Sequence, residues 1–244
     1  MVVHILNGDS LGDRFPKPLS GKVMVARECL VDGPVKAENL ESFFLLRAQF
    51  IGGYPDCSEA EYRETSLSEF EAMQAIPAGS EVNFWFEDDL FCQTNFWFCL
   101  HLLRDRVGDS EFFLIRPHNS LRYGFGGLDE KGLIAAFDQR QQLTQLADLL
   151  QLWPLYQHQE LAALQELGKK LEQPYPFLLP AINAFSRSLP TGDNPGYLHH
   201  SILTIMEELG TREFGPVFQE FCQREAIYGL GDLQVKRIFD EVVL

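Results

Sequence analysis

The chain has 244 residues, with 35 Asp and Glu against 20 Lys and Arg and a formal net charge of -15 at pH 7. Nucleic acids and anionic membrane surfaces repel so acidic a chain, and we therefore expect it to bind neither. No apolar run approaches the roughly 18 residues of a membrane helix, and the start shows no secretory signal. We therefore expect a cytoplasmic protein. Its five cysteines are widely spaced and include no C-x-x-C pair, which argues against a disulfide framework or a zinc site.

Four short apolar runs in the first half of the chain each end in a burst of polar residues. The runs are Val2 to Leu6, Lys22 to Ala26, Val82 to Phe86 and Phe112 to Ile115. Helix-like segments separate them, which predicts parallel strands of an open α/β sheet. Ligands of such sheets bind beyond the carboxyl ends of the strands, so the pattern predicts where a site lies.

The connections between these runs predict helices and turns. A helix is expected from about Glu38 to Phe50, and a Phe- and Trp-rich one from about Asp89 to Arg104 that is buried on most sides. The Gly-rich stretch from Gly124 to Leu128 does not fit the G-x-G-x-x-G pattern, and no strand leads directly into it. It is interpreted as a mobile connection rather than a phosphate loop.

From Asp129 onward the apolar spacing is helical throughout. We therefore expect an α/β domain over residues 1–135 and an all-helical region over 136–244. Within that region, residues 195–244 carry three apolar stripes and predict a three-helix, helix-turn-helix-like unit. The outward charges of its last helix cancel, which favours packing or a protein partner over DNA. The stripes are Ile202, Ile205, Met206, Leu209; Phe214, Val217, Phe218, Phe221; and Val235, Ile238, Phe239, Val242.

The densest acidic run at a strand end is Glu87-Asp88-Asp89. If Asp9 and Glu28 face the same rim, several carboxylates converge there and could recruit a hard divalent cation such as Mg²⁺. The competing interpretation is that Asp88 or Asp89 caps the next helix while the others are solvated. Both alternatives stay open at this point.

Asp89 and Gln93 are four residues apart on one helical face, where a carboxylate and an amide suit a polar ligand. The alternative, which stays open, is that Asp89 caps the helix and Gln93 is a buried amide. The basic groups near the same rim are Arg27, Arg116 and His118, which we expect to pair with the acids. His4 lies in an apolar run and is expected to be packed. The candidate ligand-binding residues are Asp9, Ser10, Glu28, Asp88, Asp89 and Gln93.

Gly8-Asp9-Ser10-Leu11 spells the nucleophile block of the GDSL hydrolases and follows the first strand, as it does there. In those enzymes the Ser attacks after a His, oriented by an Asp, takes its proton. Here no Asp precedes a His by three residues, and no G-x-N-D block occurs. We therefore expect Ser10 not to be an activated nucleophile.

Several segments together resemble the bacterial domain-of-unknown-function 1835 family, over nearly the whole chain. The resemblance implies an α/β N-terminal domain with an appended helical part. It implies no activity and no catalytic residue, because the family's function is unassigned. The segments are 4–10 (HILNGDS), 27–35 (RECLVDGPV), 85–93 (WFEDDLFCQ), 124–128 (GFGGL), 178–181 (LLPA) and 230–234 (LGDLQ).

The sequence therefore favours a protein that binds a small polar ligand, or a metal-bound one, at the strand ends. Two alternatives stay open. One is a GDSL-type hydrolase that uses Ser10, and the other is a non-catalytic regulatory or interaction protein. The sequence does not decide whether the chain is an enzyme.

Overall fold

A five-stranded sheet forms the centre of the N-terminal part of the protein, which we describe from a computed structural model covering residues 1–117, 124–192 and 194–243. The strand order is β2-β1-β3-β4-β5. The first four strands run parallel, and a two-residue β5 pairs antiparallel with β4 at one edge. This confirms the open, mostly parallel sheet. The strands are β1 (Val2–Asn7), β2 (Lys22–Ala26), β3 (Glu81–Trp85), β4 (Glu111–Ile115) and β5 (Gln141–Gln142).

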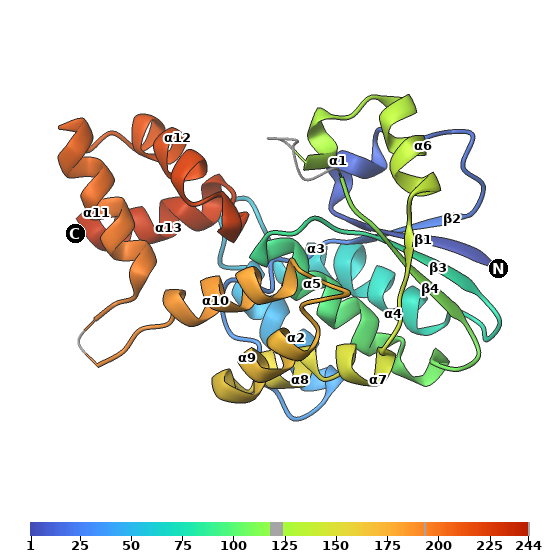
Figure 1. Ribbon diagram of the computed structural model, residues 1–244. Coiled ribbons are helices and arrows are strands. Elements are labelled where there is room, and N and C mark those ends of the chain that lie inside the picture. Colours follow the sequence, from blue (N-terminus) through green and yellow to red (C-terminus); the bar gives the residue numbers. More distant parts are fainter. Residues whose placement is uncertain (118–123, 193, 244) are drawn as a thin grey trace. The chain divides into compact units, whose positions relative to one another are not determined.

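Helices cover both faces of this sheet (Figure 1). One face carries α1 (Asp9–Gly12) and α6 (Glu130–Asp138), and the other carries α2 (Leu40–Ile51), α4 (Ser68–Gln74) and α5 (Leu90–Leu102). A four-residue α3 (Glu59–Tyr62) continues through one π-helical turn, residues 63–67, into α4. The arrangement follows from strands that are apolar on both sides and must be covered on both.

Aromatic side chains surround α5 on its face of the sheet. Phe96 on α5 contacts Phe84 of the sheet edge to face, with ring centroids 5.3 Å apart. On the other side of α5, Phe98 lies 4.9 Å from Phe43 of α2 and 4.8 Å from Trp153. The helix is therefore covered on opposite sides, which explains its nearly continuous apolar sequence.

The chain divides into two compact units at a later point than residue 135. The first unit comprises residues 1–87 and 92–160, and the second comprises 88–91 and 161–244. The short helices α7 (Leu146–Leu149) and α8 (Leu152–Gln157) belong to the first unit. Trp153 packs against Phe43, and the Tyr156 hydroxyl donates to the Leu30 carbonyl at 2.8 Å. Helical spacing alone does not reveal that these two helices complete the α/β core.

The second unit is helical, and its last three helices pack on one another. Their buried cluster comprises eight side chains, all from the three predicted stripes, and five further stripe or flanking residues are partly buried against it. Leu209 is the exception, because it is 42% exposed. In the described part of the chain, no helix is both long and apolar enough to cross a membrane. The helices are α9 (Leu161–Lys170), α10 (Leu178–Ser188), α11 (Tyr197–Leu209), α12 (Phe214–Arg224) and α13 (Asp232–Val243).

Candidate functional site

A small pocket opens at the carboxyl ends of β1 and β3. From β1 the chain crosses to β2 on one side and later returns to β3 on the other, so the strand order reverses between these two strands. Crevices at such switch points are the usual ligand sites of open α/β sheets. The pocket has a volume of about 100 Å³. Its lining residues are Asn7, Ser10, Leu11, Arg14, Trp85, Glu87, Cys92, Phe125 and Gly126.

Of the residues predicted from the sequence, Ser10 lines this pocket and Asp9 lies beside it at the rim. The Asp9 side chain is 58% exposed and forms an ion pair with Arg27, with an N–O distance of 2.8 Å. Arg27 also contacts Glu69 of α4 at 3.2 Å, and it donates to the Thr65 carbonyl at 3.3 Å. The expected pairing of Arg27 with the acids is therefore present on the α4 side of the rim.

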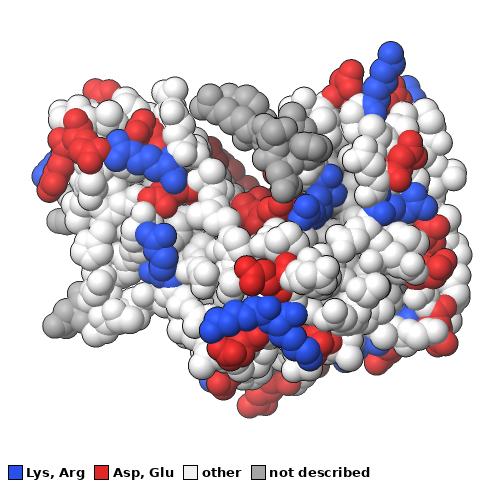
Figure 2. Space-filling view, viewed as in Figure 1, with Lys and Arg blue, Asp and Glu red and all other residues white. Residues whose placement is uncertain are grey.

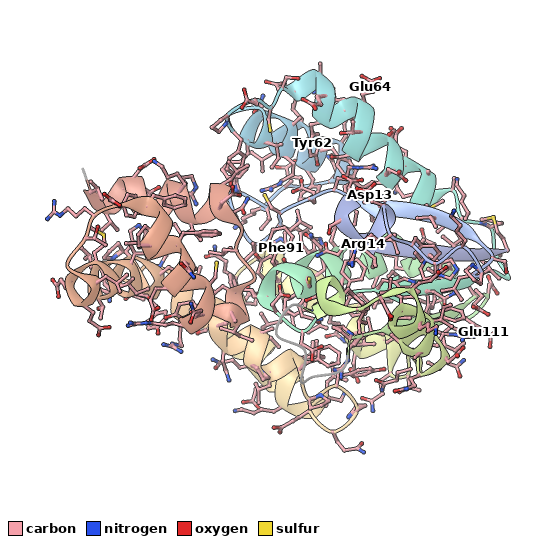
Figure 3. All side chains as sticks on the ribbon, turned by 90° about the horizontal axis from the view of Figure 1, so that it is seen from above. Asp13, Arg14, Tyr62, Glu64, Phe91 and Glu111 are labelled. Atoms are coloured by element: carbon pink, nitrogen blue, oxygen red, sulfur yellow. The ribbon has the colours of Figure 1, made fainter. Side chains whose placement is uncertain are left out.

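Around the π-helical turn before α4, one side of the helix faces the interior of the unit and the other faces outward. Figure 3 shows Tyr62 directed into the unit and Glu64 directed away from it. Burial and the neighbouring Glu28 carboxylate raise the pKa of Tyr62, so that its hydroxyl stays protonated and donates to Glu28 at 2.8 Å.

Glu28 follows β2, but its carboxylate is completely buried away from the pocket. Arg47 of α2 binds it with two parallel hydrogen bonds, from Nε at 2.9 Å and from Nη2 at 2.8 Å. The Cys29 amide donates at 2.7 Å. Both side chains of the ion pair have zero exposure. A buried charge with this many partners is a structural group.

Asp88 and Asp89 group with the second compact unit and are not among the residues that line this pocket. The Asp89 carboxylate lies directly over Gly229, where a Cβ atom would be 2.1 Å from Oδ1. Gln93 lies in the first unit and is fully buried. Its Nε2 donates to the Glu87 carbonyl at 2.6 Å, whereas its Oε1 makes no hydrogen bond to the described residues.

Among the described residues, metal ligands do not gather at the rim. The described ranges contain no group of three or more His, Cys, Asp or Glu side chains arranged to hold an ion. The reason is local, because Asp9 is oriented by Arg27 and Glu28 by Arg47.

A chain of amides supports the floor of the pocket. Asn95 of α5 donates to Asn7 Oδ1 at 2.8 Å and to the Glu28 carbonyl at 2.6 Å. Asn7 in turn donates to Cys92 Sγ at 3.0 Å. Sequence reasoning did not select these three residues, although Asn7 ends the first strand. The pattern that could have indicated them is polar residues on a helix otherwise buried on all sides.

The Gly-rich stretch is an ordered 3-10 turn, Gly124–Gly127, rather than a loose connection. Glu87 Oε1 accepts from the Phe125 amide at 2.9 Å, and Arg14 donates to the Phe125 carbonyl at 3.1 Å. Gly124 has a φ of +52°, and a Cβ there would be 1.9 Å from Glu87 Oε2. Only glycine fits this approach, which brings the turn down onto the carboxylate.

His4 supports Trp85, which forms one wall of the pocket, through a hydrogen bond. His4 is fully buried, as expected. The Trp85 indole donates to His4 Nδ1 at 3.2 Å, and His4 Nε2 donates to the Ser20 carbonyl at 3.2 Å. Burial lowers the pKa of His4 and so favours this neutral form. Trp85 also contacts Phe125, with centroids 5.7 Å apart.

Ser10 lacks the partners of an activated nucleophile within the described residues. No histidine described in the structure contacts its hydroxyl, and the adjacent Asp9 carboxylate binds Arg27. His118, considered among the rim cations, lies outside the described residues, and so does Asn119. The expectation that Ser10 is not an activated nucleophile therefore stays a prediction.

Comparisons with protein-family models, with curated proteins and with solved structures found no match to this chain. The resemblance to the domain-of-unknown-function 1835 family therefore stays a prediction.

Proposed function

We propose that this protein binds a small polar ligand at the carboxyl ends of β1 and β3. The observation that carries the proposal is the position of the 100 Å³ pocket at the point where the strand order reverses. The pocket combines apolar walls from Trp85 and Phe125 with a few polar groups, which is the usual composition of a ligand site.

Two polar groups of the pocket are suited to recognise such a ligand. The Ser10 hydroxyl is exposed and has no hydrogen-bond partner within the described residues, so it is available to a bound molecule. Glu87 presents a carboxylate whose position is set by the Phe125 amide. A ligand with a hydroxyl or amino group could donate to the Glu87 carboxylate and could donate to or accept from the Ser10 hydroxyl.

The remaining functional expectations accord with this proposal. On the face seen in Figure 2, acidic and basic side chains are interspersed, with no broad basic surface in view. This supports a ligand other than nucleic acid. A cytoplasmic location and a protein partner of the helical region are further parts of the proposal. Hydrolysis through Ser10 is not included, because no described group activates it.

A thermal-shift screen with amino acids, hydroxy acids, polyols and nucleosides tests the proposal. We expect at least one class to raise the unfolding midpoint of the wild-type protein, and Glu87→Gln or Ser10→Ala to reduce that rise. Glu111→Gln is the matched control, because Glu111 is exposed at the amino end of β4, away from the pocket (Figure 3). Equal losses in Glu87→Gln and Glu111→Gln, or no stabilising compound at all, would refute the proposed site.

A further inference from the structure

Arg14 lies at the boundary between the inner pocket and a second hollow in the same unit. The outer hollow has a volume of about 340 Å³ and shares Arg14 with the inner pocket as a lining residue. Its walls include the apolar side chains of Phe15, Leu128 and Leu133, and charged residues complete the lining. Figure 3 shows Arg14 between the end of α1 and the segment that leads into α6.

The Arg14 side chain is held only by neutral groups. It donates to the backbone carbonyls of Ser10, Phe125 and Leu128 at 3.1–3.3 Å, with a longer contact to Gly126. No carboxylate of the described residues forms an ion pair with it, and the side chain is exposed to water. Water or a ligand can take the place of these carbonyls, because Arg14 then exchanges one neutral hydrogen-bond acceptor for another.

The two volumes differ in what they can hold. The inner pocket accommodates only a small group, since each water in the liquid occupies about 30 Å³. Sites for small molecules span roughly 300–1,000 Å³, a size that the inner pocket reaches only together with the outer hollow. Ser10 and Glu87 bring polar groups to the inner pocket, whereas the outer hollow combines apolar side chains with the charged side chains of Asp13, Lys17, Asp129 and Glu130.

We propose that the ligand is elongated, with a small polar head in the inner pocket and a longer tail, part apolar and part polar, in the outer hollow, and that Arg14 is the movable partition between them. This inference rests on the proposed function and adds the class of ligand. The head would contact Ser10 and Glu87. The tail would lie against Phe15 and Leu128 once the Arg14 side chain has moved aside.

Cysteine modification tests this geometry without a natural ligand. Cys92 lines the inner pocket and is 8% exposed, Cys57 is exposed, and Cys99 is fully buried, so one chain carries the reporter and two references. The probes are methyl and hexyl methanethiosulfonate. The cysteine thiolate attacks the sulfenyl sulfur of either probe, a disulfide forms, and methanesulfinate leaves. Peptide mass spectrometry then gives the rate at each cysteine.

We expect the methyl probe to modify Cys92 in the wild-type protein and the hexyl probe to react there far more slowly. Arg14→Ala should accelerate the hexyl reaction at Cys92 by ~10-fold, equivalent to about 1.4 kcal/mol in the barrier, and leave the methyl rate nearly unchanged. Lys17→Ala is the matched control, because it removes a basic side chain of the outer hollow without removing the partition. Cys57 should react equally in all variants, and Cys99 should stay unmodified.

Three results would overturn the proposal. Equal acceleration of both probes would show that loss of Arg14 loosens the unit without joining the two spaces. An unchanged hexyl rate would show that Arg14 is not the partition, and complete inertness of Cys92 to both probes would show that the pocket does not admit them. An unchanged unfolding midpoint of Arg14→Ala excludes misfolding as the cause. Because the probes report shape and the thermal-shift screen reports binding, either proposal can fail without the other.

Discussion

The ends of β2 and β3 each carry a glutamate, and the protein uses the two in opposite ways. Glu28 after β2 is sealed from solvent and bound by Arg47, Tyr62 and a backbone amide. Glu87 after β3 is half-buried, accepts from the Phe125 amide and forms part of a pocket wall. A carboxylate at a strand end thus becomes structural where the helix behind it supplies a cation, as Arg47 does for Glu28, whereas the Glu87 carboxylate forms part of a cavity wall.

The largest expected effect comes from breaking the sealed pair. Arg47→Met leaves the Glu28 carboxylate buried without its counter-ion, which should lower the free energy of unfolding by about 3–5 kcal/mol. Urea denaturation measures this loss. The double variant Glu28→Gln/Arg47→Met should recover part of it, because no buried charge then remains. If Arg47→Met lowers the free energy of unfolding by less than the loss of an exposed ion pair does, the structural role assigned to Glu28 is wrong.

A smaller loss is expected where the Gly-rich turn approaches Glu87. Gly124→Ala forces a side chain into a left-handed conformation and against the carboxylate. Strain of this kind costs on the order of 1–3 kcal/mol. Gly192→Ala, at a positive φ but with nothing near the added Cβ, is the control that separates backbone strain from contact with Glu87. If both variants lose the same stability, contact with Glu87 contributes nothing.

The exposed ion pair at the rim should contribute less than either. Arg27→Met removes the contacts to Asp9 and Glu69, whose side chains are 58% and 25% exposed. Surface pairs are typically worth about 0–1 kcal/mol, so the midpoint of urea unfolding should move only slightly, and less still at high salt. A loss as large as that of Arg47→Met would mean that exposure does not distinguish the two strand ends.

The smallest effect on stability is expected from the titration of His4, which supports the pocket wall. At pH 8 this effect should be absent. Its folded pKa is lowered by burial from 6.5. Below pH 6.5 the unfolded chain therefore binds a proton that the folded protein does not, and stability falls as the pH falls. His4→Gln should flatten this slope between pH 7 and 5. Parallel slopes for the wild type and His4→Gln would contradict the buried, neutral role of His4.

Local pattern predicted the elements well because each is encoded within a few residues. The expected helix from Glu38 to Phe50 corresponds to α2, which begins at Leu40 with Asn39 and Ser42 forming a reciprocal cap. The three stripes of the C-terminal helices predicted their buried faces, since a helix must hide its apolar side. Leu209 is exposed because it ends α11, just before the left-handed Gly210.

The sequence indicated the edge of the sheet at which the pocket opens, but only some of the residues that line it. Ser10 lies in the pocket and Asp9 at its rim because both directly follow β1, and the strand end is a local property. Glu28 is turned away because Arg47 lies 19 positions later on another element. Arg14 and Phe125 meet although 111 positions separate them. Contacts of this kind leave no trace in the spacing of neighbouring residues.

The sequence by itself determined the strands, the apolar helix faces, the parallel sheet and the edge at which polar residues collect. These depend on short-range periodicity and on the need to cover apolar surfaces. Only the tertiary structure decided which polar residues pair with each other and which line a cavity. It also decided that α7 and α8 complete the first unit. The physical reason is that a charged or polar side chain takes its role from the partners that folding brings to it, and those partners come from distant parts of the chain.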